Sequence, residues 1–302
     1  MRNVSHDLLQ ALVIFAAGLA AGTINTVVGS GTLITFPTLL AFGYPPVVAN
    51  VSNNVGLVPG AVSGAVGYRA ELKGQRRRLL RLGAASLCGG LVGAVLLLVL
   101  PAGAFKEIVP ALIGIALVMV VFQPRLSKWV AARQAARSGD SGGPSAGDGS
   151  AGGGGSGPAG AGSGAAGGGS GAVGVVTPVA TQAIVQVGGP VLWLCVFLSG
   201  VYGGYFGAAQ GVLLLGLMGV AFTDSLQRIN ATKNVLAGLV NGVAAIVFIV
   251  AGHVNWGVAG LIAAGSILGA QVGARVGRKL PPWGLRVLIV CVGAAALVKL
   301  LA

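Results

Sequence analysis

Charged side chains are scarce in this sequence. They make up 8% of the 302 residues, whereas soluble proteins carry about 25%, so the chain has too little charge to cover a water-exposed surface. Its apolar residues fall in long blocks, and the mean hydropathy is +0.89. A bilayer core of about 30 Å needs roughly 20 mostly apolar residues per helix. The composition therefore predicts an all-α integral membrane protein.

Acidic residues are the rarest charged type, and they lie only at the ends of apolar blocks or in the connections. This placement argues against carboxylate-based metal or proton chemistry in the middle of a membrane. The sequence also has no zinc motif and no Ser/His/Asp set, and its three cysteines lie far apart within apolar runs. We therefore predict that the chain is not an enzyme and needs no metal or cofactor. The six acidic residues are Asp7, Glu71, Glu107, Asp140, Asp148 and Asp224.

Basic residues outnumber acidic ones by 19 to 6, which gives a net charge of +13. In a soluble protein this excess would suggest nucleic acid. Here most basic residues lie in three clusters between apolar blocks or at their ends, over 69–81, 125–137 and 275–286. Basic connections are typical of the cytoplasmic side of a membrane protein. We therefore predict a multi-pass protein of the cytoplasmic (inner or plasma) membrane, in contact with the lipid bilayer and not with nucleic acid.

One stretch of the chain contains almost no side chain that could be buried. Of the 35 residues over 138–172, 17 are glycine, interleaved with serine, alanine and proline. Such a composition predicts a flexible, disordered segment. We place it in a cytoplasmic loop over 125–187, between a first membrane repeat over 1–124 and a second over 188–302.

The two predicted repeats align with each other. A shift of 180 residues places the polar segment 50–54 on the segment 230–234, and both read N-x-[ST]-x-N. Apolar matches arise by chance, but a polar motif that recurs in register does not arise easily, so the sequence predicts an internal duplication. A shift of 182 aligns Gly18, Gly22 and Gly29 with Gly200, Gly204 and Gly211.

Each repeat contains a short second block of about 12 residues, which is less than a usual crossing needs. This block could be a half-helix, a re-entrant arm or a thin crossing. If the short block crosses, each repeat has five crossings, the two repeats are inverted, and the basic clusters all face the cytoplasm. If it does not cross, each repeat has four crossings, the repeats are parallel, and the last basic cluster lies outside. The positive-inside rule favours two pseudo-symmetric, inverted repeats with about 8–10 membrane segments, including short broken or re-entrant helices. The blocks are 8–28, 31–43, 47–68, 79–100 and 107–124, then 188–208, 211–222, 229–252, 254–276 and 284–301.

Polar residues inside the blocks gather at equivalent places in the two repeats: at the glycine-rich breaks and in the N-x-[ST]-x-N segments. A break in a membrane helix leaves free backbone N–H groups and the positive end of a helix dipole, and such ends hold anions. Asn50 and Asn230, or the hydroxyl two places on, suit helix N-caps. Lys233 is the only ammonium expected inside this region, and its sign fits an anion.

Simpler interpretations of these residues stay open. The asparagines and hydroxyls could serve only as N-caps, and Lys233 could extend to the cytoplasmic interface. On the functional interpretation, the predicted substrate-binding residues are Asn25, Gly29, Ser30, Gly31, Thr32, Asn50, Ser52, Asn54, Gln210, Gly211, Asn230, Thr232, Lys233 and Asn234.

Glycines spaced by four residues form a further pattern. This spacing lets helices approach closely in lipid, so it predicts helix packing, and one such face could also join two protomers in a homodimer. The glycines are Gly56, Gly60 and Gly64; Gly89 and Gly93; and Gly265, Gly269, Gly273 and Gly277.

These features together resemble the TauE/SafE sulfite exporter family. The likeness rests on Gly18 and Gly22, the break over 29–31, Pro37, the polar patches over 49–54 and 230–234, and the end of the fourth block of the second repeat at 280–281. It covers the chain except 138–172, and it implies a secondary transporter that exports a small inorganic or organosulfur anion such as sulfite or an organosulfonate. Where the family often has three or four consecutive glycines, this chain has Ser30 and the segment 208–211. The alternatives are a passive anion channel and a membrane scaffold or assembly protein without transport activity.

Overall fold

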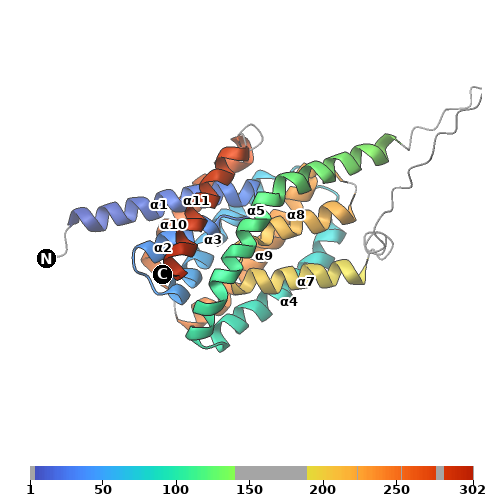
Figure 1. Cartoon of the computed structure of the whole chain (residues 1–302). Coiled ribbons are helices and arrows are strands. Elements are labelled where there is room, and N and C mark those ends of the chain that lie inside the picture. The colour runs from blue at the N-terminus through green and yellow to red at the C-terminus, as the bar shows by residue number, and fades with distance from the viewer. Residues whose placement is uncertain (1–3, 140–188, 223, 253, 277–281, 302) are drawn as a thin grey trace, which may run out of the picture.

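The structure is a computed structural model that describes residues 4–139, 189–222, 224–252, 254–276 and 282–301, and these residues form helices and connections without a β-strand (Figure 1). Each apolar block predicted from the sequence corresponds to one helix. The first half contains α1 (Val4–Val27), α2 (Thr32–Ala41), α3 (Pro46–Gly67), α4 (Arg76–Val99) and α5 (Ala102–Gly139). The second half contains α7 (Pro190–Tyr205), α8 (Gln210–Ala221), α9 (Leu226–Ala251), α10 (Trp256–Val276) and α11 (Pro282–Leu301).

Within the described residues, α1, α4, α5, α9 and α10 each contain a stretch long and apolar enough to cross a membrane, whereas α2, α7 and α8 are shorter apolar helices. The outward-facing side chains of the long helices are apolar as well. Leu91 and Val95 on α4, and Ile246 and Val250 on α9, are all exposed. A helix that is apolar on its exposed face is suited to a lipid environment.

The loop predicted from residue 125 begins later than expected, because α5 continues through Pro124 to Gly139. Apart from its first two residues, the Gly/Ser-rich stretch 138–172 lies outside the described residues.

Helices of one half pack against helices of the other in equivalent pairs. α1 lies along α10 as α7 lies along α4, and α3 packs on α10 as α9 packs on α4. Small residues bring the backbones together: a Cβ added at Gly18 would lie 2.9 Å from the Cα of Ile262, and one at Gly200 would lie 2.9 Å from the carbonyl oxygen of Ser86. Because the pairs alternate between halves, neither half has a core of its own.

The prediction that four-residue glycine spacing serves helix packing is confirmed. Gly89 and Gly93 lie against the backbone of α7, and Gly265 and Gly269 lie against the backbone of α1. The glycines of this pattern that the structure describes are buried between helices of one chain. None of these described glycines is exposed, so they give no support to the accompanying prediction of a homodimer through a glycine face.

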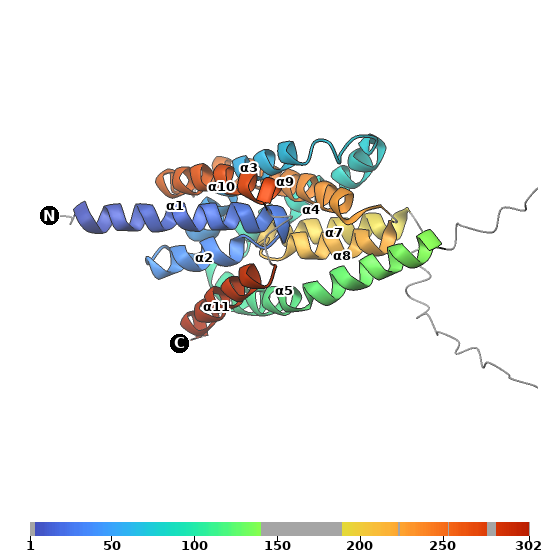
Figure 2. The same cartoon turned by 90° about the horizontal axis from the view of Figure 1, so that it is seen from above.

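The short helices α2 and α8 run back along the helices that precede them. Gln10 Nε2, near the start of α1, donates to the Tyr44 hydroxyl, just after α2, at 3.0 Å, so α2 runs back toward the end at which α1 begins (Figure 2). In the second half, Phe222 after α8 lines the same cavity as Gly189 and Trp193 at the start of α7. A thin crossing and a re-entrant arm would both return the chain to the end from which it came, so both alternatives drawn from the sequence fit these contacts.

α1 and α7 begin at opposite ends of the molecule (Figure 2). The basic connection before α4 and the start of α9 lie at the same end, because Gln75 Nε2 donates to the carbonyl of Arg228 at 3.5 Å.

Neither asparagine motif supplies an N-cap, which corrects the capping interpretation. α3 begins at Pro46 after Pro45, and α9 begins after Ser225; neither Pro45 nor Ser225 makes a side-chain cap bond. Proline suits the first helical position because its fixed φ matches the helix and it has no N–H to satisfy. Asn50 and Asn230 consequently lie inside their helices, where their amides point sideways to other helices.

Candidate functional site

The two breaks meet at the centre of the molecule. Gly29, which follows α1, and Gly211, at the start of α8, are equivalent residues, and the Gly211 N–H donates to the Gly29 carbonyl at 3.2 Å. The contact is between bare backbones, because a Cβ added at Gly29 would lie 2.5 Å from the Cα of Gly211. We call the segments 28–32 and 206–211 the junction. A side chain at either position would collide with the backbone of the other segment, which explains why both residues are glycine.

Two helices begin at the junction, and neither has a side-chain N-cap. α2 begins after Gly31 and α8 after Ala209, and neither N-cap residue makes a side-chain bond to the first turn. The first N–H groups of a helix lack partners inside it and carry partial positive charge. Ser30 and Gln210, which lie beside these ends, are 0% and 3% exposed. Buried, uncapped helix N-termini are suited to holding an anion.

The C-terminal end of α1 is held by side chains from α9. The Thr26 carbonyl accepts hydrogen bonds from Asn230 Nδ2 at 3.1 Å and from Asn234 Nδ2 at 3.2 Å. Lys233 Nζ donates to the Asn25 carbonyl at 3.2 Å and to that of Thr26 at 3.5 Å. These donors satisfy the negative end of the α1 dipole, so the positive N-termini dominate the field at the junction.

The C-terminal end of α7 is held in the equivalent way by α3. Asn50 Nδ2 donates to the Tyr205 carbonyl at 3.0 Å, as Asn230 does to that of Thr26. The polar segment of each half therefore fixes the broken helix of the other half.

Lys233 is buried, with 1% of its surface exposed, so the alternative in which it extends to the membrane interface is wrong. It lies about 10 Å along α9 from the first residue of the helix, at 1.5 Å per residue. Its bonds go to carbonyl oxygens, and no carboxylate of the described chain forms an ion pair with it. An ammonium that is buried without a counter-ion is costly, and binding of an anion would remove that cost.

Asn53, which aligns with Lys233, was not among the predicted site residues. Its Nδ2 donates to Thr32 Oγ1 at 3.3 Å, and its Oδ1 accepts a hydrogen bond from Thr35. It therefore fixes the first turn of α2 at the junction. The alignment of the two polar segments would have indicated it, because its equivalent is the buried lysine.

Several polar atoms at the predicted site are buried and lack a hydrogen-bond partner in the part of the chain that the structure describes. They are Ser30 Oγ, Asn54 Oδ1, Gln210 Nε2 and Asn230 Oδ1. A buried polar group without a partner costs about 1–3 kcal/mol, and most such groups in proteins are paired. Ser30 Oγ and Gln210 Nε2 can donate to a ligand, whereas the two asparagine oxygens can only accept from one.

Comparison with known proteins assigns the chain to a family. The model of the sulfite exporter TauE/SafE family matches it twice, over residues 14–186 and 178–300, so each half carries the family pattern. The chain belongs to the TauE/SafE sulfite exporter family. The resemblance inferred from the glycine breaks and polar segments is confirmed.

Its relatives in the TauE/SafE family are named as transporters. The "Probable membrane transporter protein ORF9" of a Sinorhizobium species is 28% identical over 100% of this chain and 95% of the relative. The "Probable membrane transporter protein YfcA" of Escherichia coli K12 is 27% identical over 96% of this chain and 88% of the relative. No solved structure gives a significant match. Together with the five described helices that are long and apolar enough to span a membrane, these findings identify a multi-pass membrane transporter and not an enzyme.

Ser52 and Thr232, two of the predicted site residues, bond to the connections that precede α10 and α4. Ser52 Oγ accepts from the Asn255 N–H at 2.9 Å, and Thr232 Oγ1 donates to Gln75 Oε1 at 2.9 Å. Asn255 and Gln75 are themselves equivalent under the shift of 180. In this TauE/SafE chain the two hydroxyls therefore fasten the halves together at opposite ends, while the neighbouring asparagines contact the broken helices.

The two equivalent asparagines are expected to differ in their effect on stability. Asn50→Ala removes the side-chain donor to the Tyr205 carbonyl, which has no second side-chain donor among the described residues. Asn230→Ala leaves the Thr26 carbonyl bonded to Asn234 and Lys233. We expect Asn50→Ala to lower the free energy of unfolding by about 1–3 kcal/mol and Asn230→Ala by less. Thermal unfolding of the purified variants in detergent measures this, and equal losses would contradict the assigned hydrogen bonds.

Proposed function

We propose that the chain is a secondary transporter that exports a small sulfur oxyanion, such as sulfite or an organosulfonate, and that the anion binds at the junction. The observation that carries this proposal is Lys233: a buried ammonium, without a carboxylate partner in the described chain, at the end of α1 just before the first break. Charge of one sign with free polar groups around it favours a ligand of the opposite sign. The family's description as sulfite exporters supports the choice of anion.

The proposed site uses the residues that surround the junction. Ser30, Thr32 and Gln210 belong to the two helix N-termini, and Asn54, Asn230 and Lys233 come from the polar segments of α3 and α9. An oxyanion would accept hydrogen bonds from Ser30 Oγ, Gln210 Nε2 and the Lys233 ammonium. Asn54 Oδ1 and Asn230 Oδ1 can only accept, so they would pair with a donor group of the ligand. Most backbone N–H groups in the first turns of α2 and α8 already donate to nearby carbonyls. The first N–H of each helix, at Thr32 and at Gln210, would supply a further donor.

We further propose that the halves over 1–124 and 188–302 are inverted repeats, each with a re-entrant pair and three crossings. A cavity of about 680 Å³ beside Asp7, Tyr44 and Asn255 lies at one end of the molecule. Another of about 340 Å³, beside Arg78 and Arg228, lies at the other. Since the junction between them is buried, a bound anion reaches either side only when the halves move relative to each other, as in alternating access.

The test of this function is flux of sulfite in proteoliposomes that contain the purified chain. We expect labelled sulfite to enter the vesicles, and to enter faster when unlabelled sulfite is present on the opposite side, because carriers show such counterflow and channels do not. Asn54→Ala, Lys233→Ala and Asn234→Ala should each reduce it, whereas Lys128→Ala, on the exposed side of α5, should not. Flux that is unchanged in all three site variants would contradict the site. Flux without counterflow would indicate a channel, and a folded protein without flux would favour a scaffold.

A further inference from the structure

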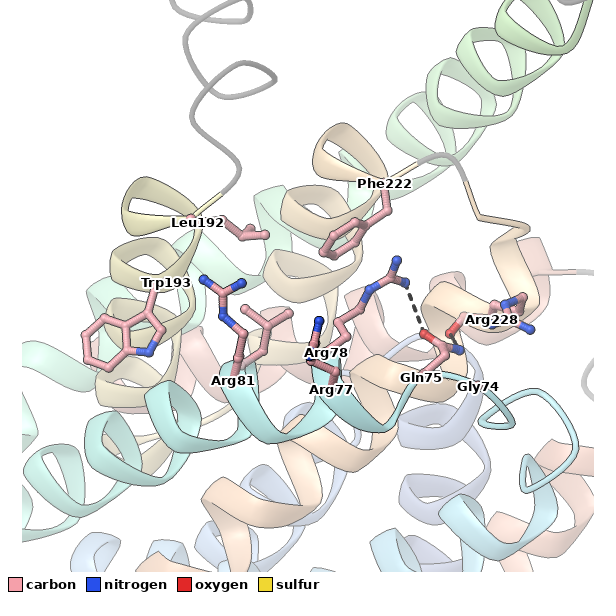
Figure 3. Close-up of a pocket in the computed structure, with 11 residues that line it drawn as sticks. Gly74, Gln75, Arg77, Arg78, Arg81, Leu192, Trp193, Phe222 and Arg228 are labelled. Atoms are coloured by element: carbon pink, nitrogen blue, oxygen red, sulfur yellow. Dashed lines mark hydrogen bonds between the residues drawn. The ribbon is translucent and has the colours of Figure 1, made fainter.

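A second cavity site lies away from the junction, at the end where α4, α7 and α9 begin. It has a volume of about 340 Å³, within the range of about 300–1,000 Å³ that is usual for small-ligand sites. One wall carries Arg77, Arg78 and Arg81 of α4 and Arg228 of α9, and the other carries Trp193 of α7 and Phe222 (Figure 3). Guanidinium groups thus face aromatic rings across one cavity.

The charge around this cavity is strongly positive. Asp224 is the carboxylate that pairs with Arg78, and it also pairs with Arg228 at 3.2 Å. Arg77 and Arg81 make no hydrogen bond or ion pair with the described residues. The first turns of α4, α7 and α9 lie at the cavity and add the positive ends of their dipoles. Arginine at a helix N-terminus is unfavourable unless an anion is near, so the cavity is arranged for a negative group.

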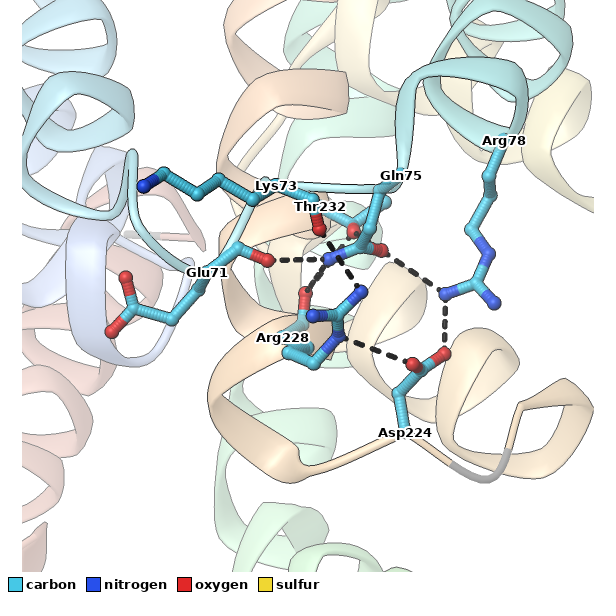
Figure 4. A network of polar contacts seen from close by, with 7 residues as sticks. All are labelled: Glu71, Lys73, Gln75, Arg78, Asp224, Arg228 and Thr232. Atoms are coloured by element: carbon cyan, nitrogen blue, oxygen red, sulfur yellow. Dashed lines mark hydrogen bonds and ion pairs between the residues drawn. The ribbon is translucent and has the colours of Figure 1, made fainter.

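A buried polar network fixes two of the arginines in place (Figure 4). Gln75, only 3% exposed, accepts a hydrogen bond on Oε1 from Arg78 Nη1 at 3.1 Å. The Arg78 guanidinium also lies 3.8 Å from the centre of the Phe222 ring, and Arg228 Nη2 donates to the Lys73 carbonyl at 3.3 Å. Guanidinium groups held in this way lose little conformational entropy on binding, so Arg78 and Arg228 form a fixed wall of the cavity.

The apolar side chains at and beside the cavity are exposed. Trp193 is 39% exposed and stacks on Phe197 with ring centres 5.8 Å apart, and tryptophan is enriched at the depth of the lipid headgroups. Leu80 on α4 and Leu194 on α7, both next to lining residues, are 66% and 51% exposed. A ligand in this cavity would therefore have a negative group at the arginines and could extend an apolar chain along α4 and α7.

We propose that this cavity binds the phosphate group of an anionic phospholipid from the leaflet on this side, which the basic clusters assign to the cytoplasm. Arg77 and Arg81 bind the phosphate, Arg78 and Arg228 shape the site, and an acyl chain lies along Leu80 and Leu194. A free oxyanion offers the same charge to the arginines. It would leave the aromatic and leucine side of the cavity without a partner, so the lipid fits the whole site.

The test is native mass spectrometry of the full chain released from nanodiscs that contain equal amounts of phosphatidylglycerol and phosphatidylcholine. We expect one phosphatidylglycerol to remain bound in preference. In the double variant Arg77→Gln/Arg81→Gln, its retention should fall about tenfold or more, since each basic residue near a membrane contributes about 1 kcal/mol to anionic-lipid binding. These two arginines take no part in the polar network, so the variant should fold.

The matched control is Arg69→Gln/Lys73→Gln, which removes two exposed positive charges from the connection at the same end but outside the cavity. We expect it to retain the lipid. Equal loss in both double variants would overturn the proposal, because it would indicate general surface attraction. Displacement of the lipid by inorganic phosphate would also overturn it, in favour of a site for free oxyanions. The readout requires no flux, so it is independent of the proposed transport function.

Discussion

Replacing Lys233 with methionine is expected to reduce anion flux in proteoliposomes by about tenfold to a hundredfold, the equivalent of about 1.5–3 kcal/mol for hydrogen bonds to a charged group. Methionine fills a similar volume without a charge or a donor. The Thr26 carbonyl keeps its bonds to Asn230 and Asn234, so the C-terminal end of α1 stays in place. The expected loss is therefore one of anion binding more than of folding.

Lys233→Gln separates the charge of the lysine from its hydrogen bonds. Glutamine can still donate to the carbonyls of Asn25 and Thr26, but it cannot offset the charge of an anion. If Lys233 serves the substrate, this variant should transport as poorly as Lys233→Met. If it only supports α1, glutamine should restore most of the flux, and the proposed role would be wrong. Lys128→Gln, on the exposed side of α5, controls for the loss of one positive charge elsewhere.

Binding can also be measured without transport. A ligand that binds only the folded state raises its stability by RT ln(1 + [L]/Kd), so sulfite should raise the unfolding temperature of the wild-type chain in detergent. The increase should vanish in Lys233→Met and Lys233→Gln but persist in Lys128→Gln. If another oxyanion stabilises the wild-type chain and sulfite does not, the proposed site would stand but its proposed substrate would be wrong.

The helices of this fold could be predicted from the sequence because they depend on local properties. Hydropathy and length locate each apolar block, and glycine and proline mark the ends. The block 47–68 corresponds to Pro46–Gly67 and the block 254–276 to Trp256–Val276. The register of the duplication also appears in the structure, since Ser52 with Asn255 and Thr232 with Gln75 are equivalent contacts.

The direction of the short helices could not be predicted in this way. A segment of about 12 apolar residues has the same composition whether it crosses or turns back. The packing of the short helices depends on contacts that no local sequence pattern indicates, such as Gln10 with Tyr44 and Gly29 with Gly211. Basic residues do not reveal the difference, because replacing two crossings by one re-entrant pair in each half leaves each cluster on the same side.

The polar residues of the site were identified by type and position, but their partners were not. The role of Asn50 depends on where its helix begins. It would be an N-cap if the helix began just after it, but the helix begins four residues earlier, at Pro46. Pro45 and Pro46 were visible in the sequence and are a cue for the earlier start. The bonds of Lys233 to the end of α1 could not be anticipated, since they depend on the crossing of α9 over a break more than 200 residues away.

Gly29→Ala is expected to destabilise the protein more than an alanine substitution at Gly43 or Gly211. Gly29 has φ of +93°, a conformation that costs an alanine roughly 1–2 kcal/mol. The added Cβ would also lie 2.5 Å from the Cα of Gly211, and overpacking of this kind costs about 1–3 kcal/mol. Together these costs are a large part of the usual stability of about 5–15 kcal/mol. Thermal unfolding in detergent should show the loss, and flux should be lost with it.

Two other glycines separate the two costs. Gly43 has φ of +82°, but a Cβ there would meet nothing within 4 Å, so Gly43→Ala has the backbone cost alone. Gly211 is not among the glycines of positive φ, yet a Cβ there would contact Gly29, so Gly211→Ala has the contact cost alone. We expect Gly29→Ala to lower the unfolding temperature most, and flux to be lost in both junction variants but kept in Gly43→Ala. If Gly29→Ala were no worse than Gly43→Ala, the two breaks would not touch, and a single anion site shared by both halves would lose its structural basis.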